Sequence, residues 1–87
     1  MKLLIVEDSL SVRQILKTLV APLAMEINEC GDGVDAVSIY QTYRPDIVLM
    51  DVDLNEMDGI TATRKIIACD PHAKVIIVTN YDENDLR

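Results

Sequence analysis

Three short runs of apolar residues limit most strongly what this chain can fold into. They occupy residues 3–6, 47–50 and 75–78 and are rich in valine, isoleucine and leucine. Continuous apolar runs of this length, without alternation, are typical of parallel strands that are covered on both faces. A fourth segment, 25–29, alternates apolar and polar residues. We therefore expect 25–29 to form a strand at the edge of the sheet, where one face is wetter.

Amphipathic helical patterns fill the gaps between these strands. The first begins after Ser9, a candidate N-cap, and ends near Pro22. Its apolar positions have helical spacing, and they are Val12, Ile15, Leu16, Leu19 and Val20. The second helix is expected to begin at 32–33 and to stop before Pro45, since proline disfavours helix in the residue before it.

A third helix is predicted between Asp58, its expected cap, and the 70–71 pair that ends it. Its inward-facing residues should be Ile60, Thr63, Ile66 and Ile67. Asp82 is placed to cap a fourth helix, of which the 87 residues contain only the start. The alternation of strands and helices predicts one α/β domain over residues 1–87, with a parallel sheet and right-handed crossovers. We expect four strands, three helices and the opening of a fourth.

Composition excludes some kinds of partner. The chain has 15 acidic and 8 basic residues, a formal net charge of −7, and no basic stripe for nucleic acid. The start of the chain, 1–8, is too short in apolar residues and too quickly acidic for a signal peptide or a membrane span. We therefore expect a cytoplasmic protein that binds neither nucleic acid nor membrane.

Polar side chains follow three of the predicted strands. Glu7 and Asp8 come directly after the first, Asp51 after the third along the chain, and Thr79 after the fourth. Taken singly, such acids are better explained as helix caps or turn residues. Together they predict a site, because the carboxyl ends of parallel strands meet at one edge and form the ligand crevice of open α/β sheets.

The chemistry of this cluster indicates a hydrated divalent cation. Carboxylates brought close together repel one another unless a cation or protons intervene, and an all-oxygen donor set suits Mg²⁺. A bound Mg²⁺ would let a phosphoryl group approach Asp51, and the Thr79 hydroxyl could donate to that group.

Several motifs resemble the receiver domains of two-component response regulators, in the same order and with the same spacing. They are Ile5-Val6-Glu7-Asp8-Ser9, Gly31-Asp32-Gly33, Pro45-Asp46-Ile47-Val48-Leu49-Met50-Asp51, Met57-Asp58-Gly59 and Val78-Thr79. The resemblance covers the whole chain. It implies a flavodoxin-like fold and a signalling role rather than an enzymatic one, with a sensor histidine kinase that donates phosphate from its phosphohistidine.

The same resemblance implies roles for individual residues. Asp51 is then the phosphoacceptor, Asp8 and Asp51 bind Mg²⁺ directly, and Glu7 acts largely through water. The backbone carbonyl of Asp53 completes the metal site, and Thr79 is the switch hydroxyl that moves toward the phosphoryl group.

The sequence also departs from the family pattern. Receiver domains carry a lysine after a fifth strand, followed by a fifth helix, and residues 1–87 contain neither. Lys74 precedes its strand and belongs at the opposite edge. We therefore expect impaired switching on phosphorylation, and a homodimer formed through the apolar surface that a missing strand and helix would leave. In the loop after Asp51, the usual Met-Pro pair is replaced by 54–55, Leu-Asn.

Two alternatives stay open at this stage. One is a signalling-inactive receiver that serves as a dimerising interaction module, which the absent lysine and the apolar edge support. The other is a phosphatase like those of the haloacid-dehalogenase type, because Asp51 and Asp53 form an Asp-x-Asp motif. In such phosphatases that motif follows the first strand, whereas here it follows the third.

Overall fold

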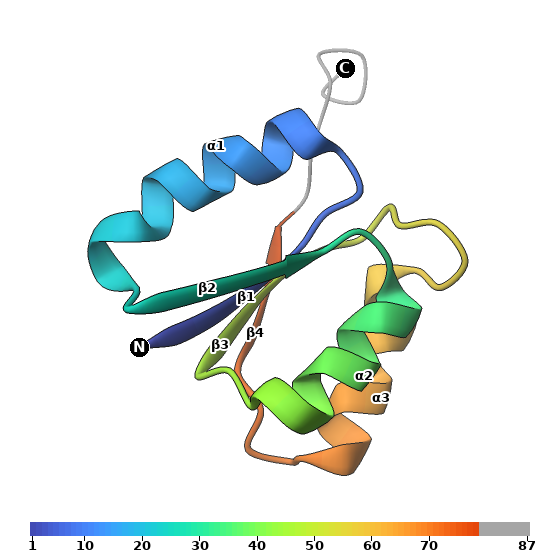
Figure 1. Cartoon of the computed structure of the whole chain (residues 1–87). Helices are drawn as coiled ribbons and strands as arrows, with labels where there is room; N and C mark the ends of the chain where they lie inside the picture. The colour runs from blue at the N-terminus through green and yellow to red at the C-terminus, as the bar shows by residue number, and fades with distance from the viewer. Residues whose placement is uncertain (79–87) are drawn as a thin grey trace, which may run out of the picture.

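A computed structural model describes residues 1–78, and Figure 1 shows how its helices and strands are arranged. The strands form a single parallel sheet in the order β2-β1-β3-β4. The elements along the chain are β1 (Lys2–Val6), α1 (Leu10–Val20), the 3₁₀ helix η1 (Ala21–Leu23), β2 (Glu26–Cys30), α2 (Gly33–Tyr43), β3 (Ile47–Asp51), α3 (Gly59–Cys69) and β4 (Val75–Val78). The predicted α/β receiver-like fold is therefore confirmed, with four parallel strands and three α-helices in the described part.

The positions of β1, β2 and β3 follow their residue patterns, whereas β4 is less covered than its apolar run predicted. β1 and β3 are the apolar strands with neighbours on both sides, and most of their residues are buried. The alternating strand β2 lies at the edge, as expected. β4 forms the other edge of the described sheet, and its central residues Ile76 and Ile77 are 51% and 39% exposed.

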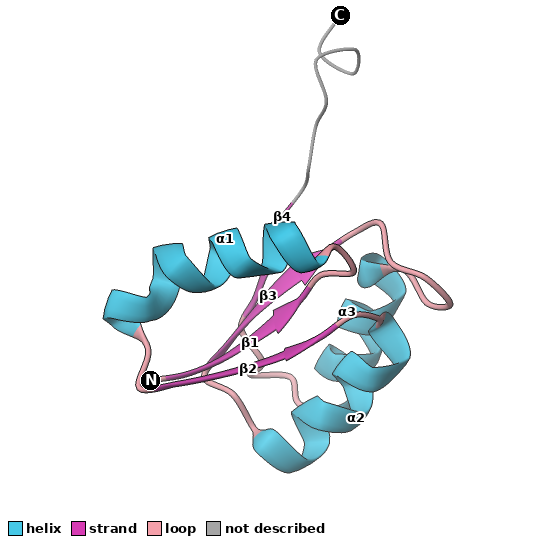
Figure 2. Cartoon of the chain, turned by 45° about the horizontal axis from the view of Figure 1, so that its top comes forward, coloured by secondary structure: helices cyan, strands magenta, loops and turns pink. Residues whose placement is uncertain are grey.

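Helix α1 covers one face of the sheet, while α2 and α3 lie together on the other, as the turned view in Figure 2 shows. The main core forms between the sheet and the α2–α3 pair. Its fully buried members alternate along the strands and recur at helical spacing. They are Leu4, Val6, Val48 and Met50 from the strands and Ala36, Ala62 and Ile66 from the helices.

The predicted inward face of the third helix is partly wrong. α3 begins after the expected cap Asp58, whose side chain accepts a hydrogen bond from the Thr61 backbone N–H. Its buried residues include Ile66, but Ile60 and Ile67 are 40% and 44% exposed. Besides Ile66, the buried residues of α3 are the small Gly59 and Ala62, which let the helix backbone come close to the sheet.

Helix α1 has the predicted cap and end but a more exposed apolar stripe than expected. Ser9 is its N-cap, and Pro22 lies in the short 3₁₀ turn that follows. No residue of α1 is buried, and Ile15 and Leu19 are 58% and 68% exposed. An apolar hollow of about 210 Å³ separates the end of α1 from β3 and β4.

Thr79 and the expected fourth helix at Asp82 lie outside the described residues. Within residues 1–78, no helix combines the length and apolar character that crossing a membrane would need.

Candidate functional site

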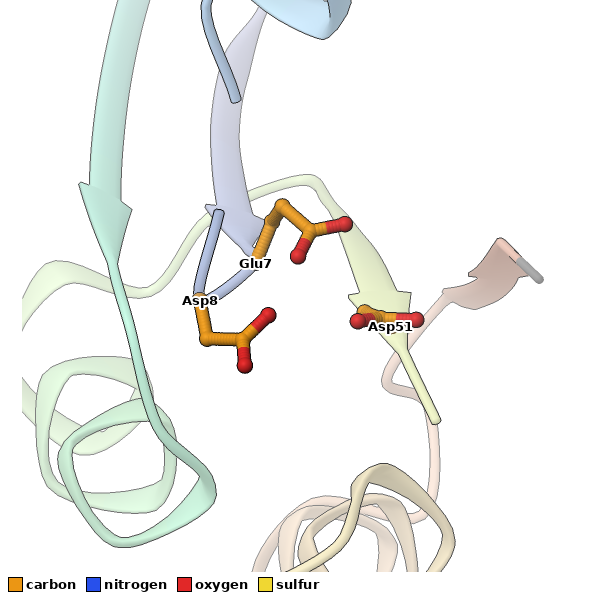
Figure 3. Close-up of side chains that lie close together, drawn as sticks. All are labelled: Glu7, Asp8 and Asp51. Carbon is orange, nitrogen blue, oxygen red and sulfur yellow. The ribbon is translucent and has the colours of Figure 1, made fainter. Parts of the chain in front are cut away.

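Three carboxylates meet at the carboxyl ends of β1 and β3. One carboxylate oxygen from each of Glu7, Asp8 and Asp51 lies within 4.8 Å of the other two. Figure 3 shows these side chains gathered around one space beyond the two strands. The register explains the meeting, because Val6 pairs with Met50 and the next residue on each strand is therefore an acid. The predicted convergence of these three acids is observed.

Burial sets the electrostatics of this cluster. Glu7 and Asp51 are only 4% and 6% exposed, whereas Asp8 is open to solvent. Removal from water raises the pKa of the Glu7 carboxyl from 4.5 to about 7, and the neighbouring Asp8 and Asp51 carboxyls add to the rise. A backbone hydrogen bond from the Ser9 N–H to Glu7 Oε2, 3.0 Å long, opposes it.

The first turn of α1 holds the Glu7 side chain in place. The Ser9 N–H donates to Glu7, and the Ser9 hydroxyl in turn accepts from the Val12 N–H at 3.3 Å. The residue that caps the helix therefore also orients one of the acids. A serine directly after two acids was the sequence signal for this arrangement, although only its capping role was predicted.

The carboxylate of Asp53 is not one of the clustered side chains. Asp53 is exposed in the loop between β3 and α3, at the centre of a tight turn in which the Leu54 N–H donates to the Val52 carbonyl at 3.1 Å. Its role was predicted for the backbone carbonyl, and its carboxylate is not part of the three-acid group. Thr79 lies outside the described residues.

Sequence reasoning missed one residue that shapes the site directly. Gly59 opens α3, and a Cβ added there would overlap the carbonyl oxygen of Asp51. Its N–H also donates to the Val52 carbonyl at 2.9 Å. Gly59 therefore lets α3 pack directly on the backbone of the candidate phosphoacceptor. The quoted motif 57–59 contained the signal, but the close approach exists only in the folded chain.

The donor set fits a hard divalent cation. The ion pairs among residues 1–78 join Glu29 to Arg13 and Lys17, and Arg44 to Asp70, so none of them reaches the three clustered acids. Lys74 lies at the opposite edge, as expected, where it lines a hollow with Met1 and Tyr40. Carboxylate oxygens are the ligands that Mg²⁺ prefers in proteins.

Comparison with known proteins identifies the family. The family model for the response regulator receiver domain matches residues 3–87. The chain belongs to the response regulator receiver family. Receiver domains are phosphoacceptor modules of two-component signalling that bind Mg²⁺ and work with a cognate histidine kinase. That membership favours the receiver interpretation over the phosphatase alternative.

Individual relatives support this assignment. Chemotaxis protein CheY of Listeria monocytogenes is 42% identical over 78 residues, which is 88% of this chain and 66% of that protein. Chemotaxis protein CheY of Thermotoga maritima is 39% identical over 77 residues, 87% of this chain and 64% of its own length. The receiver chain thus spans about two thirds of these relatives.

Solved structures agree with the fold. A crystal structure of the CheX–CheY–BeF₃–Mg²⁺ complex from Borrelia burgdorferi matches with a TM-score of 0.82 and 31% identity, over 99% of this chain and 66% of that one. The N-terminal domain of a protein from Wolinella succinogenes matches with a TM-score of 0.84 and 26% identity, over 99% and 69% of the two chains.

Proposed function

We propose that this receiver domain accepts a phosphoryl group on Asp51, in a reaction that requires Mg²⁺ and uses the phosphohistidine of a sensor histidine kinase. The observation that carries the proposal is the meeting of Glu7, Asp8 and Asp51 within 4.8 Å of one another. The acidic cluster would repel a phosphoryl group on its own, so a cation is required for any phosphotransfer here.

Each residue has a defined role in this reaction. A carboxylate oxygen of Asp51 attacks the phosphorus, a P–O bond forms, and the P–N bond to the kinase imidazole breaks. Asp8 and Asp51 would bind Mg²⁺ directly, Glu7 through water, and the Asp53 carbonyl would complete the protein ligands. Bound Mg²⁺ supplies positive charge against the phosphoryl oxygens. Thr79 is proposed as the hydroxyl that contacts the phosphoryl group.

A small phosphodonor tests the proposal without the kinase. Incubation with acetyl phosphate and Mg²⁺ should add about 80 Da to the intact mass, the mass of one phosphoryl group. Asp51→Asn should abolish the adduct, and EDTA should suppress it. Asp46→Asn is the matched control, because Asp46 lies at the other edge of the sheet and bonds the backbone N–H of Lys2 instead. An adduct that persists in Asp51→Asn would overturn the proposal.

We also propose that the protein forms a homodimer through an exposed apolar surface. Ile15, Leu19, Leu23 and Ile76 are each more than half exposed, and Leu23 and Ile76 line the apolar hollow beside α1. Exposed apolar surface of this kind commonly marks an interface, and a stable dimer would bury on the order of 1,200 Å². Light scattering after size exclusion should give twice the mass of the chain. The mass of a single chain at micromolar protein concentration would contradict the proposed homodimer.

The experiments test the homodimer and the phosphoacceptor role of Asp51 independently of each other. A protein that dimerises but acquires no phosphoryl adduct would match the interaction-module alternative. Impaired switching stays a prediction, as does the cytoplasmic location.

A further inference from the structure

We propose that Gly33 is a positioning residue for the magnesium site, acting through the loop that carries the Asp53 carbonyl. The inference rests on the proposed function, because it concerns how that site is held in shape. Gly33 is distant in sequence from the acids and from the loop, and its effect depends on a backbone contact that only glycine permits.

The contact lies where α2 begins. Gly33 is the first residue of α2 and is buried. A Cβ added at this position would overlap the carbonyl oxygen of Met57 and lie 3.1 Å from both the carbonyl carbon and the Cβ of that residue. No glycine among the described residues has positive φ, so this glycine is required for close approach and not for backbone conformation.

Met57 belongs to a loop, 52–58, that is tied at several points. The Met57 N–H donates to the Asn55 carbonyl at 2.7 Å, and Glu56 between them has a φ of 64°, a rare conformation for a residue with a side chain. A parallel bridge joins Asn55 to Asp32, the cap of α2. The loop is therefore fastened to the start of α2 both at Asn55 and at Met57.

The surroundings decide which part moves when a methyl group is added at residue 33. Helix α2 is held by Ala36 and Tyr40, which are 0% and 3% exposed in the core. The far end of the loop is held by Gly59, which packs on the Asp51 carbonyl. The exposed residues of the loop can move more easily than either anchor, and they include Asp53, which lies between the Val52 carbonyl that the Gly59 N–H bonds and Asn55, which bridges to Asp32. The added methyl group should therefore displace the loop and with it the proposed metal-binding carbonyl.

Gly31 provides a matched control from the same motif. A Cβ added at Gly31 would have its nearest neighbour, Arg13 Nη2, at 3.6 Å, an ordinary van der Waals distance. Gly31→Ala and Gly33→Ala thus add the same methyl group two residues apart, and only the second overlaps backbone, because the nearest backbone atoms to the first, Asp8 Cα and the Glu7 carbonyl oxygen, are 4.0 Å away. Any difference between the two variants reports the contact with the loop.

A Mg²⁺ titration followed by amide NMR tests the proposal. Gly33→Ala should weaken Mg²⁺ binding about tenfold, the effect typical of residues that orient metal ligands. In the metal-free protein it should shift the amide resonances of 52–57, while Gly31→Ala changes neither property. Tyr40→Phe controls for stability, because it weakens the same helix far from the loop and should lower the melting temperature without changing the Mg²⁺ dissociation constant.

The outcomes are distinguishable. A folded Gly33→Ala protein with the wild-type Mg²⁺ dissociation constant overturns the role of Gly33. Wild-type protein that binds no Mg²⁺ overturns the proposed function instead. Should Gly33→Ala fail to fold, Gly33→Ala/Met57→Gly keeps the overlap with the carbonyl at residue 57 but frees the loop backbone to shift away from the added methyl group. That double variant, compared with Met57→Gly alone, should still bind Mg²⁺ more weakly, and equal binding overturns the proposal.

Discussion

The two edges of the sheet use acidic residues in opposite ways. At the amino-terminal edge, Asp46 Oδ2 accepts from the Lys2 backbone N–H at 2.7 Å, and Asp70 Oδ2 accepts from the Tyr40 hydroxyl at 2.7 Å. At the carboxyl-terminal edge, Glu7 and Asp51 are buried beside each other with no ion pair among the described residues. One edge uses its acids to join elements, whereas the other concentrates negative charge.

The pKa values of acids at the two edges shift in opposite directions. Hydrogen bonds from Tyr40 and from the His72 N–H hold the pKa of Asp70 below its usual value. Burial moves the pKa of Glu7 in the other direction, to about 7. A buried, ionised acid without a cation beside it destabilises the fold unless a ligand compensates, and such conflicts are typical of functional sites. The comparison therefore locates the site independently of the sequence motif.

The largest expected effect is on Mg²⁺ binding. Asp51→Asn should weaken binding by about a hundredfold, because it removes a charged ligand. Asp46→Asn removes one negative charge from the opposite edge and should leave the dissociation constant nearly unchanged. Calorimetric titration of both variants measures the difference. Equal weakening would mean that overall charge, and not the site, attracts the cation.

The next largest effect is the dependence of the free energy of unfolding on pH through the ionisation of Glu7. Because the folded protein holds a proton on Glu7 up to about pH 7, while the unfolded chain releases it near 4.5, the free energy of unfolding should fall as pH rises through that window. Glu7→Gln should not lose stability in this pH range, because glutamine does not ionise. Without Mg²⁺ it should be more stable than wild type by roughly 2 kcal/mol at about pH 8, after allowance for screening by water at the mouth of the site.

At a pH below 4.5, Glu7 is protonated in both states and the advantage of Glu7→Gln should vanish. Urea denaturation in EDTA at both pH values measures the two differences. An advantage that is the same at both would show that the substitution acts through packing and that the ionised carboxylate costs nothing.

A smaller effect tests the opposite edge. Tyr40→Phe removes the hydrogen bond to Asp70 and should lower the free energy of unfolding by about 1 kcal/mol, as is usual for a neutral donor bonded inside a protein. Asp70→Asn keeps an oxygen acceptor and should lose less than Asp70→Ala. A Tyr40→Phe protein as stable as wild type would show that this bond does not help to hold α2 against the turn before β4.

The smallest effect is at the start of α1. Ser9→Ala removes the side-chain cap of Val12 and should cost about 0.5 to 1 kcal/mol. Ser11→Ala is the control, because its hydroxyl is exposed and bonds only Ser9 within the described residues. Thermal unfolding of the two variants should separate them. Equal melting temperatures would show that the cap contributes little.

Local patterns predicted most of the fold. The four strands, the caps Ser9 and Asp58 and the start of α2 at residue 33 lie where apolar runs, capping residues and helical patterns indicated them. The inward face of α3 was less predictable, since Ile60 and Ile67 remain partly exposed. Helical spacing shows which residues share a face, but the depth to which that face is buried depends on the neighbouring helix and sheet.

The candidate site, like the fold, could be predicted from the sequence only in part. The order of the residues was sufficient to bring Glu7, Asp8 and Asp51 to one edge, because parallel strands align their carboxyl ends. The contacts of Gly33 with Met57 and of Gly59 with Asp51 could not be predicted, since they join backbones that are distant in sequence. Sequence alone thus determined which chemical groups gather, through strand direction and side-chain type. Only the tertiary structure decided how they are buried and held, because desolvation and close backbone packing depend on every element around the site at once.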